Sequence, residues 1–214
     1  MTRVFDEGFW DERYAGKGSV WSGNPNPQLV TETAELGALS TAERKTALDV
    51  GCGEGADSVW LAGRGWHVTG VDISRVALQR ARDHAAELSL CGSITWEHRD
   101  LLQWIPPACS FSLVSLQFMH LPPNDRERVY ALLAAAVATG GTLLIVGHSE
   151  SDVLAGARRP KGSELFFTAV EASAALEPDR WNVEVAESRP RLDKGRNGET
   201  ITVHDEVVRA VRLA

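Results

Sequence analysis

Short apolar runs alternate along the chain with longer amphipathic stretches. The apolar runs predict strands at residues 46–50, 66–71, 93–98, 111–116 and 142–147. The stretches between them predict helices at 55–63, 74–88 and 124–138, with Ser74 and Asn124 as N-caps. Strands that alternate with helices in this way form an α/β fold, with a mostly parallel sheet and helices on both of its faces.

Both ends of the chain depart from this alternation. The N-terminal part predicts an amphipathic helix at 2–14, a loop at 16–27 and a further helix at 28–39. After a helix at 168–176, two β-rich runs follow at 181–188 and 200–211, joined by a polar link at 189–199. No helix fits into this link, so we expect the two runs to form an antiparallel hairpin, which brings the sheet to seven strands.

A glycine-rich run joins the first predicted strand to the helix that follows it. Gly51, Gly53 and Gly55 alternate there, and Asp72 lies seventeen residues after Gly55, at the end of the second strand. Glycines let the backbone approach a ligand, and an acid at this place in an open α/β sheet binds ribose hydroxyls. The run therefore predicts a site for a cofactor that carries a nucleoside.

Two kinds of cofactor fit this layout. The spacing from Gly51 through Gly53 to Ala56 satisfies the loose dinucleotide fingerprint. Asp49 argues against it, because a carboxylate repels a pyrophosphate and attracts a cationic ligand. The run 47–55 resembles motif I of the class I S-adenosylmethionine-dependent methyltransferases, with their Rossmann-like sheet of seven strands. That resemblance implies that Asp49 lies near the methionine end of the cofactor and that Asp72 holds the ribose.

The resemblance implies further contacts to the cofactor. Asp100 and Leu101 are similar to the family's acid–hydrophobe pair, in which the acid accepts from the adenine amine and the apolar side chain packs on the ring; the alternative for Asp100 is a helix cap. Gln117 occupies the motif IV position beside the methionine moiety. Cys52 lies in the glycine loop as a small packing residue, and Ile73 follows Asp72.

Three aromatic residues near the N-terminus predict a lid. The spacing of Trp10, Tyr14 and Trp21 resembles the thiopurine S-methyltransferases and the tellurite-resistance methyltransferases, in which an N-terminal helix and its loop cover the cofactor and wall the acceptor site. An aromatic face attracts a sulfonium by roughly 0.5–2 kcal/mol. The alternative is that these rings only pack the helix on the domain. The likeness to this subgroup rests mainly on residues 9–30, whereas the likeness to the class covers nearly the whole chain.

The acceptor side offers two candidate bases. Methyl transfer from a sulfonium mainly requires alignment and exclusion of water, and a base is needed only for poorly acidic acceptors. His120 lies at the predicted rim of the cleft and His148 ends the fifth strand. Further candidate contacts to the acceptor are Trp21, Met119, His120, Arg158 and Phe166. The alternatives are a solvated loop for Arg158 and its neighbour Arg159, and a helix anchor for Phe166.

The amino-acid composition restricts the classes of partner and the cellular compartment that we expect for this protein. The 214 residues carry a net charge of −7, which argues against a protein that grips nucleic acid through phosphates. Cys52, Cys91 and Cys109 have no metal-like spacing, which predicts a reducing compartment and no metal site. Residues 1–7 are charged and without a long apolar run, so we expect neither a secretory signal nor a membrane span. The expectation is a cytoplasmic monomer.

We therefore expect one methyltransferase domain over residues 1–214. It comprises a helical lid at 1–40, a cofactor-binding core at 46–147, and a substrate-side loop, helix and hairpin at 148–214. The predicted reaction transfers a methyl group from S-adenosylmethionine, by in-line displacement, to a small-molecule acceptor such as a thiol or another soft nucleophile. The alternatives are a phenol or amine acceptor with a histidine base, a nicotinamide oxidoreductase, and a regulator that binds the cofactor without catalysis.

Overall fold

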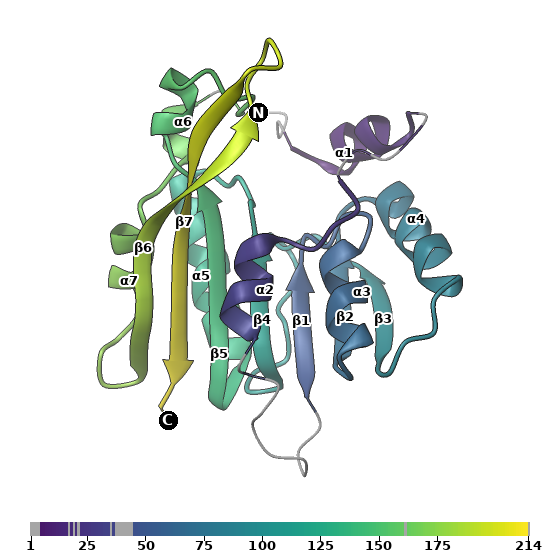
Figure 1. Cartoon of the computed structure of the whole chain (residues 1–214). Coiled ribbons are helices and arrows are strands. Elements are labelled where there is room, and N and C mark those ends of the chain that lie inside the picture. Colours follow the sequence, from purple (N-terminus) through teal and green to yellow (C-terminus); the bar gives the residue numbers. More distant parts are fainter. Residues whose placement is uncertain are drawn as a thin grey trace.

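One sheet of seven strands, in the order β3-β2-β1-β4-β5-β7-β6, organises the chain (Figure 1). The computed structural model describes residues 5–16, 18, 20, 22–34, 36, 45–160 and 162–213. The strands are β1 (Thr46–Val50), β2 (His67–Asp72), β3 (Ser93–His98), β4 (Phe111–Gln117), β5 (Val137–His148), β6 (Trp181–Lys194) and β7 (Thr200–Arg212). β1 to β5 are parallel and β7 is antiparallel to both of its neighbours, which confirms the predicted sheet and hairpin.

Helices cover both faces of this sheet. They are α1 (Glu7–Tyr14), α2 (Pro27–Thr33), α3 (Ala56–Gly63), α4 (Arg75–Ala86), α5 (Pro123–Ala136), α6 (Ser151–Leu154) and α7 (Ala169–Ala174). Leu48 and Val50 of β1 face a core with α5 and α7, whereas Ala47 faces a second core with α2 and α3. This split follows from the alternation of side chains along a strand. In the described part of the chain, no helix is long and apolar enough to cross a membrane.

Several element ends differ from the sequence predictions. α1 begins at Glu7 because the Asp6 side chain caps it, accepting from the Phe9 N–H at 2.9 Å. α2 ends at Thr33, before the predicted end, and residues 37–40 lie outside the described chain. The predicted cap at Asn124 is wrong: Pro122 is the N-cap residue of α5, and no side chain caps that helix. Proline suits this place because its missing N–H is not needed there.

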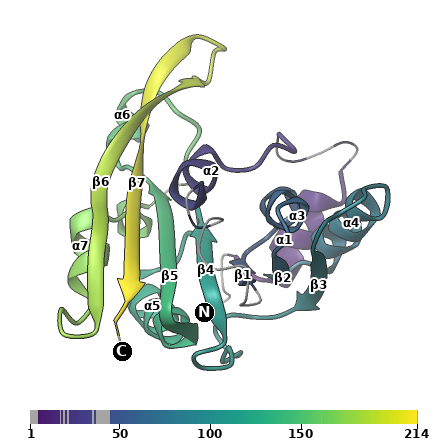
Figure 2. The same cartoon turned by 60° about the horizontal axis from the view of Figure 1, so that its bottom comes forward.

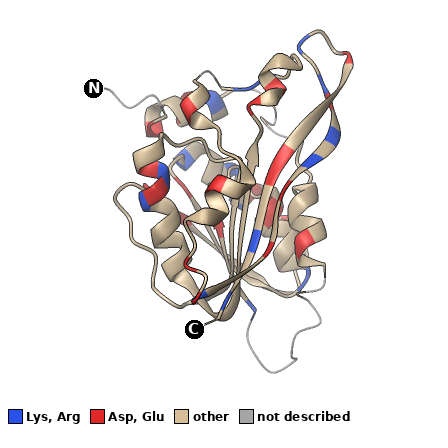
Figure 3. Ribbon diagram, turned by 90° about the vertical axis from the view of Figure 1, so that its left-hand side faces the viewer, with Lys and Arg blue, Asp and Glu red and all other residues tan. Residues whose placement is uncertain are grey.

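The hairpin is longer than predicted, so the expected link at 189–199 is wrong over most of its length. Arg189 pairs with Asp205, and Arg191 with Val203, as strand neighbours, and only residues 195–199 lie between the strands. The Arg191 Nε lies 2.9 Å from the Asp205 carboxylate, which is fully buried. Ion pairs between neighbouring strands therefore stabilise this polar run in a β-strand conformation. The hairpin arches beyond the sheet (Figure 2) and carries both signs of charge along its length (Figure 3).

Candidate functional site

The glycine loop after β1 adopts a conformation that favours glycine. Gly51, Gly53 and Gly55 have φ angles of 69°, 54° and 86°. A Cβ atom on Gly55 would lie 2.6 Å from the Trp96 ring, and one on Gly51 would lie 2.6 Å from the Met119 methyl carbon. Contacts this close require glycine at Gly51 and Gly55, and the loop lies at the carboxyl end of β1, where open α/β sheets bind their ligands.

Asp72 closes this loop from the end of β2. Its two oxygens accept from the Gly53 N–H at 2.9 Å and from the Ser74 N–H at 2.8 Å. Burial raises its pKa, although these hydrogen bonds act in the opposite direction. Each carboxylate oxygen has more than one acceptor site, so capacity remains for a ribose hydroxyl. Ile73 lies half-buried beside it, and its carbonyl is 2.8 Å from the His98 Nε2 atom.

Two more carboxylates lie at the loop. Asp49 is 2% exposed and accepts from the Ser58 hydroxyl at 2.6 Å. Burial, together with the charges of Asp57 and Asp72, raises the pKa of Asp49 to about 7. Burial also raises the pKa of Asp57 to about 6, while Asp57 accepts from the Asn26 N–H at 2.6 Å. The three acids give the loop a negative potential that favours a cation.

Cys52 sits within the loop as a packing residue. It is half-buried, and its N–H donates to the Val71 carbonyl at 3.0 Å. Burial and the neighbouring acids raise its thiol pKa well above the usual range. A thiol in this state is a poor nucleophile, in keeping with the expectation for this residue.

α1 is held against the start of α4. The Asp11 carboxylate accepts from the Ser74 hydroxyl at 2.6 Å, and the Trp10 and Tyr14 rings lie 6.1 Å apart. Tyr14 is 3% exposed, which agrees with a packing role. Figure 1 places α1 at one end of the upper sheet edge and α6 at the other. The lid role of Trp10 and Tyr14 stays a prediction, and Trp21 lies outside the described residues.

An ion pair that sequence reasoning missed ties the following segment to the glycine loop. The Arg80 Nη1 atom lies 2.8 Å from the Glu54 carboxylate and 2.7 Å from the Gly18 carbonyl. The second Glu54 oxygen accepts from the Val20 N–H at 2.9 Å. No local pattern marks these residues, since the contacts join parts of the chain far apart in sequence.

Asp100 and Leu101 follow β3, as predicted. The Asp100 carboxylate accepts from the Leu102 N–H at 3.0 Å and from the Gln103 side-chain amide at 2.9 Å. This is the turn-capping role that a short polar residue favours. Leu101 is half-buried and packs against the core. Their contact with an adenine ring stays a prediction.

The end of β4 carries unsatisfied polar atoms and an unusual backbone. The Gln117 side-chain amide donates to the Ser115 hydroxyl at 2.8 Å, but its buried Oε1 has no partner in the described structure. Phe118 has a φ angle of 52°, which non-glycine residues rarely adopt, and its ring stacks on His148 with centroids 4.2 Å apart. Strained residues of this kind gather at ligand sites.

His120 and His148 lie together at this edge. Their ring centroids are 5.4 Å apart, and the His120 Nε2 and His148 Nδ1 atoms are buried without a partner among the described residues. Burial and the charge of Arg159 lower the pKa of His120 to about 4. The same causes lower that of His148 to about 2. Both rings are therefore neutral near pH 7, and buried polar atoms left without partners are rare enough to mark a binding surface.

Arg126 of α5 holds part of the segment after β5 in place. The Arg126 guanidinium donates to the carbonyls of Leu121, Glu164 and Phe166, at 3.4, 3.1 and 3.3 Å. This holds the predicted acceptor residue Phe166 beside the chain that follows His120. Arg126 was not predicted, because its partners are backbone atoms that carry no sequence signal.

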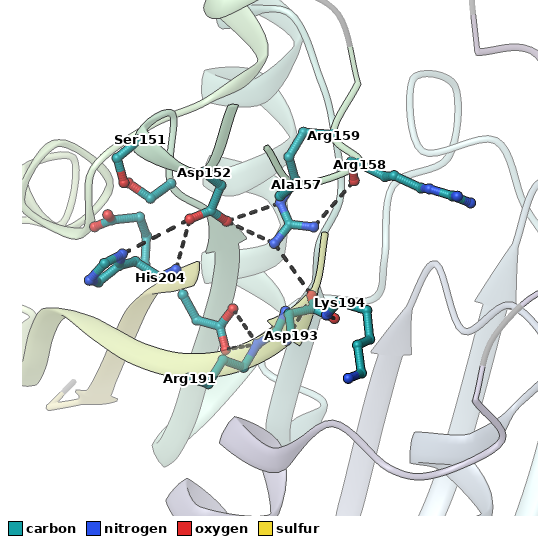
Figure 4. Close-up of polar contacts among 12 residues, drawn as sticks. Ser151, Asp152, Ala157, Arg158, Arg159, Arg191, Asp193, Lys194 and His204 are labelled. Carbon is teal, nitrogen blue, oxygen red and sulfur yellow. Dashed lines mark hydrogen bonds and ion pairs between the residues drawn. The ribbon is translucent and has the colours of Figure 1, made fainter. Parts of the chain in front are cut away.

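Arg158 and Arg159 differ in their surroundings. The Arg159 side chain is 6% exposed and lies 2.8 Å from the fully buried Asp152 carboxylate (Figure 4). Arg158 is exposed and donates to the Arg196 carbonyl at 3.3 Å. A groove of about 610 Å³ is lined by Arg159 and Phe166, and Arg158 is not among its described lining residues. Contact of Arg158 with an acceptor stays a prediction that this placement does not support.

Known proteins resemble this chain in sequence. Residues 47–141 match a family model described as a methyltransferase domain. The chain is 29% identical over 140 residues to the 27-O-demethylrifamycin SV methyltransferase of Amycolatopsis mediterranei, covering 64% of this chain and 48% of that protein. It is 31% identical over 108 residues to the probable thiol methyltransferase 2 of Arabidopsis thaliana, covering 50% and 46%. The chain thus spans about half the length of these curated relatives.

The fold is also similar to solved structures. One is the protein studied for the conversion of a disulfide bond into a thioacetal group during echinomycin biosynthesis. It aligns with a TM-score of 0.74 and 24% identity, over 97% of this chain and 92% of that one. At this identity the likeness concerns the fold, and it agrees with the sheet order and the reversed final strand described above.

Proposed function

Because residues 47–141 match a methyltransferase-domain model, we propose that the protein is a class I methyltransferase that transfers a methyl group from S-adenosylmethionine to a small-molecule acceptor. The observation that carries the proposal is the cluster of Asp49, Asp57 and Asp72 around the glycine loop. Burial raises the pKa of all three, and none of them forms an ion pair within the described part of the chain, so a sulfonium and an ammonium group would supply the missing positive charge.

The residues at this edge fit that cofactor. Asp72 would bind the ribose hydroxyls, and the glycine loop with the buried Asp49 would lie beside the methionine part. The unpartnered Gln117 Oε1 is a hydrogen-bond acceptor suited to an ammonium group. When bound, the cofactor supplies a methyl group on a positively charged sulfur, which needs no further activation. The protein's task is then to align the acceptor and to exclude water.

The state of the two histidines favours an acceptor that ionises readily. A neutral imidazole whose conjugate acid has a pKa near 4 or 2 is a weak base, poorly matched to a phenol or to an ammonium group. A thiol ionises near neutral pH without a strong base. Among the relatives, one is named a probable thiol methyltransferase and another acts on an O-demethylated compound, so both acceptor classes belong in the test.

The test is release of S-adenosylhomocysteine from the full chain with thiophenol, phenol and aniline, alongside calorimetric binding of S-adenosylmethionine. We expect release to be fastest with the thiol. His120→Gln should slow phenol far more than thiol if the histidine acts as a base, and equal effects would make its role structural. Cofactor binding without release on any acceptor would refute catalysis and favour a regulatory protein. Absence of cofactor binding would refute the whole proposal.

A further inference from the structure

The groove beside the carboxyl end of β5 lies outside the glycine loop. Its volume of about 610 Å³ falls within the range of about 300–1,000 Å³ that is usual for small-ligand sites. Its described walls come from α6, from the turn of the β6–β7 hairpin, and from Arg159, Pro160, Gly162, Ser163 and Phe166. The stretch that follows β5 and the hairpin turn, which are distant in sequence, therefore meet around it.

One side of the groove is apolar. Leu154 of α6 is 93% exposed, and Val153 beside it is 42% exposed. Pro160 and Phe166 complete the apolar lining. The core does not use Leu154, and exposed apolar side chains gathered at a groove mark a surface for an apolar ligand or partner.

The hairpin turn brings a guanidinium to the same groove. The Arg196 N–H donates to the Gly156 carbonyl at 3.2 Å, and the Arg196 Nε donates to the Ala157 carbonyl at 3.4 Å. No carboxylate of the described chain pairs with Arg196, so its charge is available to a ligand. Arg159, by contrast, is neutralised by Asp152. The carboxylate among the described lining residues is the exposed Glu150, which solvent screens.

We propose that this groove selects a methyl acceptor that is amphipathic and anionic, with its apolar body over Leu154 and Phe166 and its anionic group at Arg196. This inference rests on the proposed function, since it names the substrate class of that activity. Arg159 lines the groove and also acts electrostatically on His120 and His148, so the groove lies beside the end of β5 where the two histidines meet.

The first test measures binding without turnover. The probes are 4-(methylthio)benzoate and 4-(methylthio)benzamide, which have the same shape and differ in charge. They are titrated into the full chain in the presence of S-adenosylhomocysteine. We expect the carboxylate to bind at least about tenfold more tightly than the amide, as charge-assisted hydrogen bonds to a guanidinium allow. Arg196→Gln should abolish this preference, whereas Arg180→Gln, which removes an exposed arginine that does not line the groove, should keep it.

The second test uses the matching thiols, 4-mercaptobenzoate and 4-mercaptobenzamide, with S-adenosylhomocysteine release as the readout. A higher kcat/KM for the carboxylate that Arg196→Gln removes would support the inference. Equal binding of the two probes, no binding of either, or a preference that survives Arg196→Gln would overturn it. If the binding preference holds but neither thiol is methylated, the groove assignment stands and the proposed catalytic activity fails.

Discussion

Replacing Asp49 by Asn should remove a loss of stability that the ligand-free protein undergoes as the pH rises. In the folded chain, burial and the neighbouring charges raise the pKa of Asp49 from 3.8 to about 7. The folded state therefore binds this proton more tightly than the unfolded state does. The stabilisation is complete below the unfolded pKa and is lost as the pH rises through the folded pKa.

The size of the effect follows from these two pKa values. As the pH rises from the unfolded to the folded pKa of Asp49, its titration lowers the free energy of unfolding by up to about 1.4 kcal/mol per pH unit. From pH 5 to pH 8 the relation gives a loss of roughly 2–3 kcal/mol from Asp49 alone. Asparagine removes the titration but keeps an oxygen that can accept from the Ser58 hydroxyl, 2.6 Å away in the wild type. The substitution thus separates the charge from the hydrogen bond.

Urea denaturation of the ligand-free chain at pH 5 and pH 8 measures this effect. Asp49→Asn should lose roughly 2–3 kcal/mol less stability over this range than the wild type. Asp83→Asn, at an exposed site on α4 that also accepts a side-chain hydrogen bond, should behave as the wild type. Equal losses in Asp49→Asn and wild type would refute the reasoning about the buried carboxylate.

The same carboxylate should link cofactor affinity to pH. A cationic ligand favours the ionised form of Asp49, so the affinity for S-adenosylmethionine should rise between pH 5 and pH 8. S-adenosylhomocysteine lacks the sulfonium charge and serves as the reference. Calorimetry should give a ratio of the two affinities that rises with pH in the wild type and rises less in Asp49→Asn. A constant ratio in the wild type would contradict the electrostatic account.

Three further substitutions test the site and its supports. Asp72→Ala should weaken S-adenosylmethionine binding about 10–100-fold in calorimetry, because the ribose loses a charge-assisted contact. Gly55→Ala should lower the free energy of unfolding in urea by roughly 2–3 kcal/mol, since φ is 86° and the new Cβ would meet Trp96 at 2.6 Å. Asp11→Ala should release α1 from α4, which faster proteolytic cleavage near the N-terminus would report.

Each of these has a matched control. Asp83→Ala should leave cofactor affinity unchanged, and an equal loss there would mean that Asp72 acts only through net charge. Gly63→Ala, in a helix with open space around it, should be neutral or slightly stabilising. Glu12→Ala changes an exposed acid on α1 next to Asp11, and cleavage as fast as in Asp11→Ala would reject the anchoring role.

Local sequence patterns were enough to predict the parallel strands, the helix α4 and the glycine loop. The short apolar runs gave the parallel strands, because central strands such as β1 and β4 are buried on both faces. Ser74 caps α4 as predicted, accepting from the Ala77 N–H at 3.0 Å. The loop of Gly51, Gly53 and Gly55 was recognisable because its backbone conformation restricts the residue type at each position.

The part of the chain after β5, where we propose that the acceptor binds, was hidden from such patterns. Asp152 stands in a polar stretch that suggests a flexible loop, yet it is fully buried, and it accepts from the His204 N–H at 2.8 Å, fifty-two residues away in sequence. The hairpin was predicted too short for a related reason. Arg191 becomes a strand residue through Asp205 on the neighbouring strand. Polar positions that are buried by pairing with distant residues cannot be distinguished, from sequence alone, from positions that face water.

The charges left without an ion-pair partner among the described residues differ in sign between the glycine loop and the groove, and this bears on the proposed reaction. Buried acids such as Asp49 surround the loop after β1, whereas Arg196, which no carboxylate of the described chain pairs with, lies on the groove after β5. Between them, His120 and His148 stay neutral, so neither adds a charge that would compete for the methyl acceptor. Transfer from a cation to an anion removes both charges, and such a reaction is favoured in a site that excludes water. An acceptor bearing a positive charge would meet repulsion from Arg196 at the groove, which is why a protonated amine should be a poorer substrate than an anionic thiol.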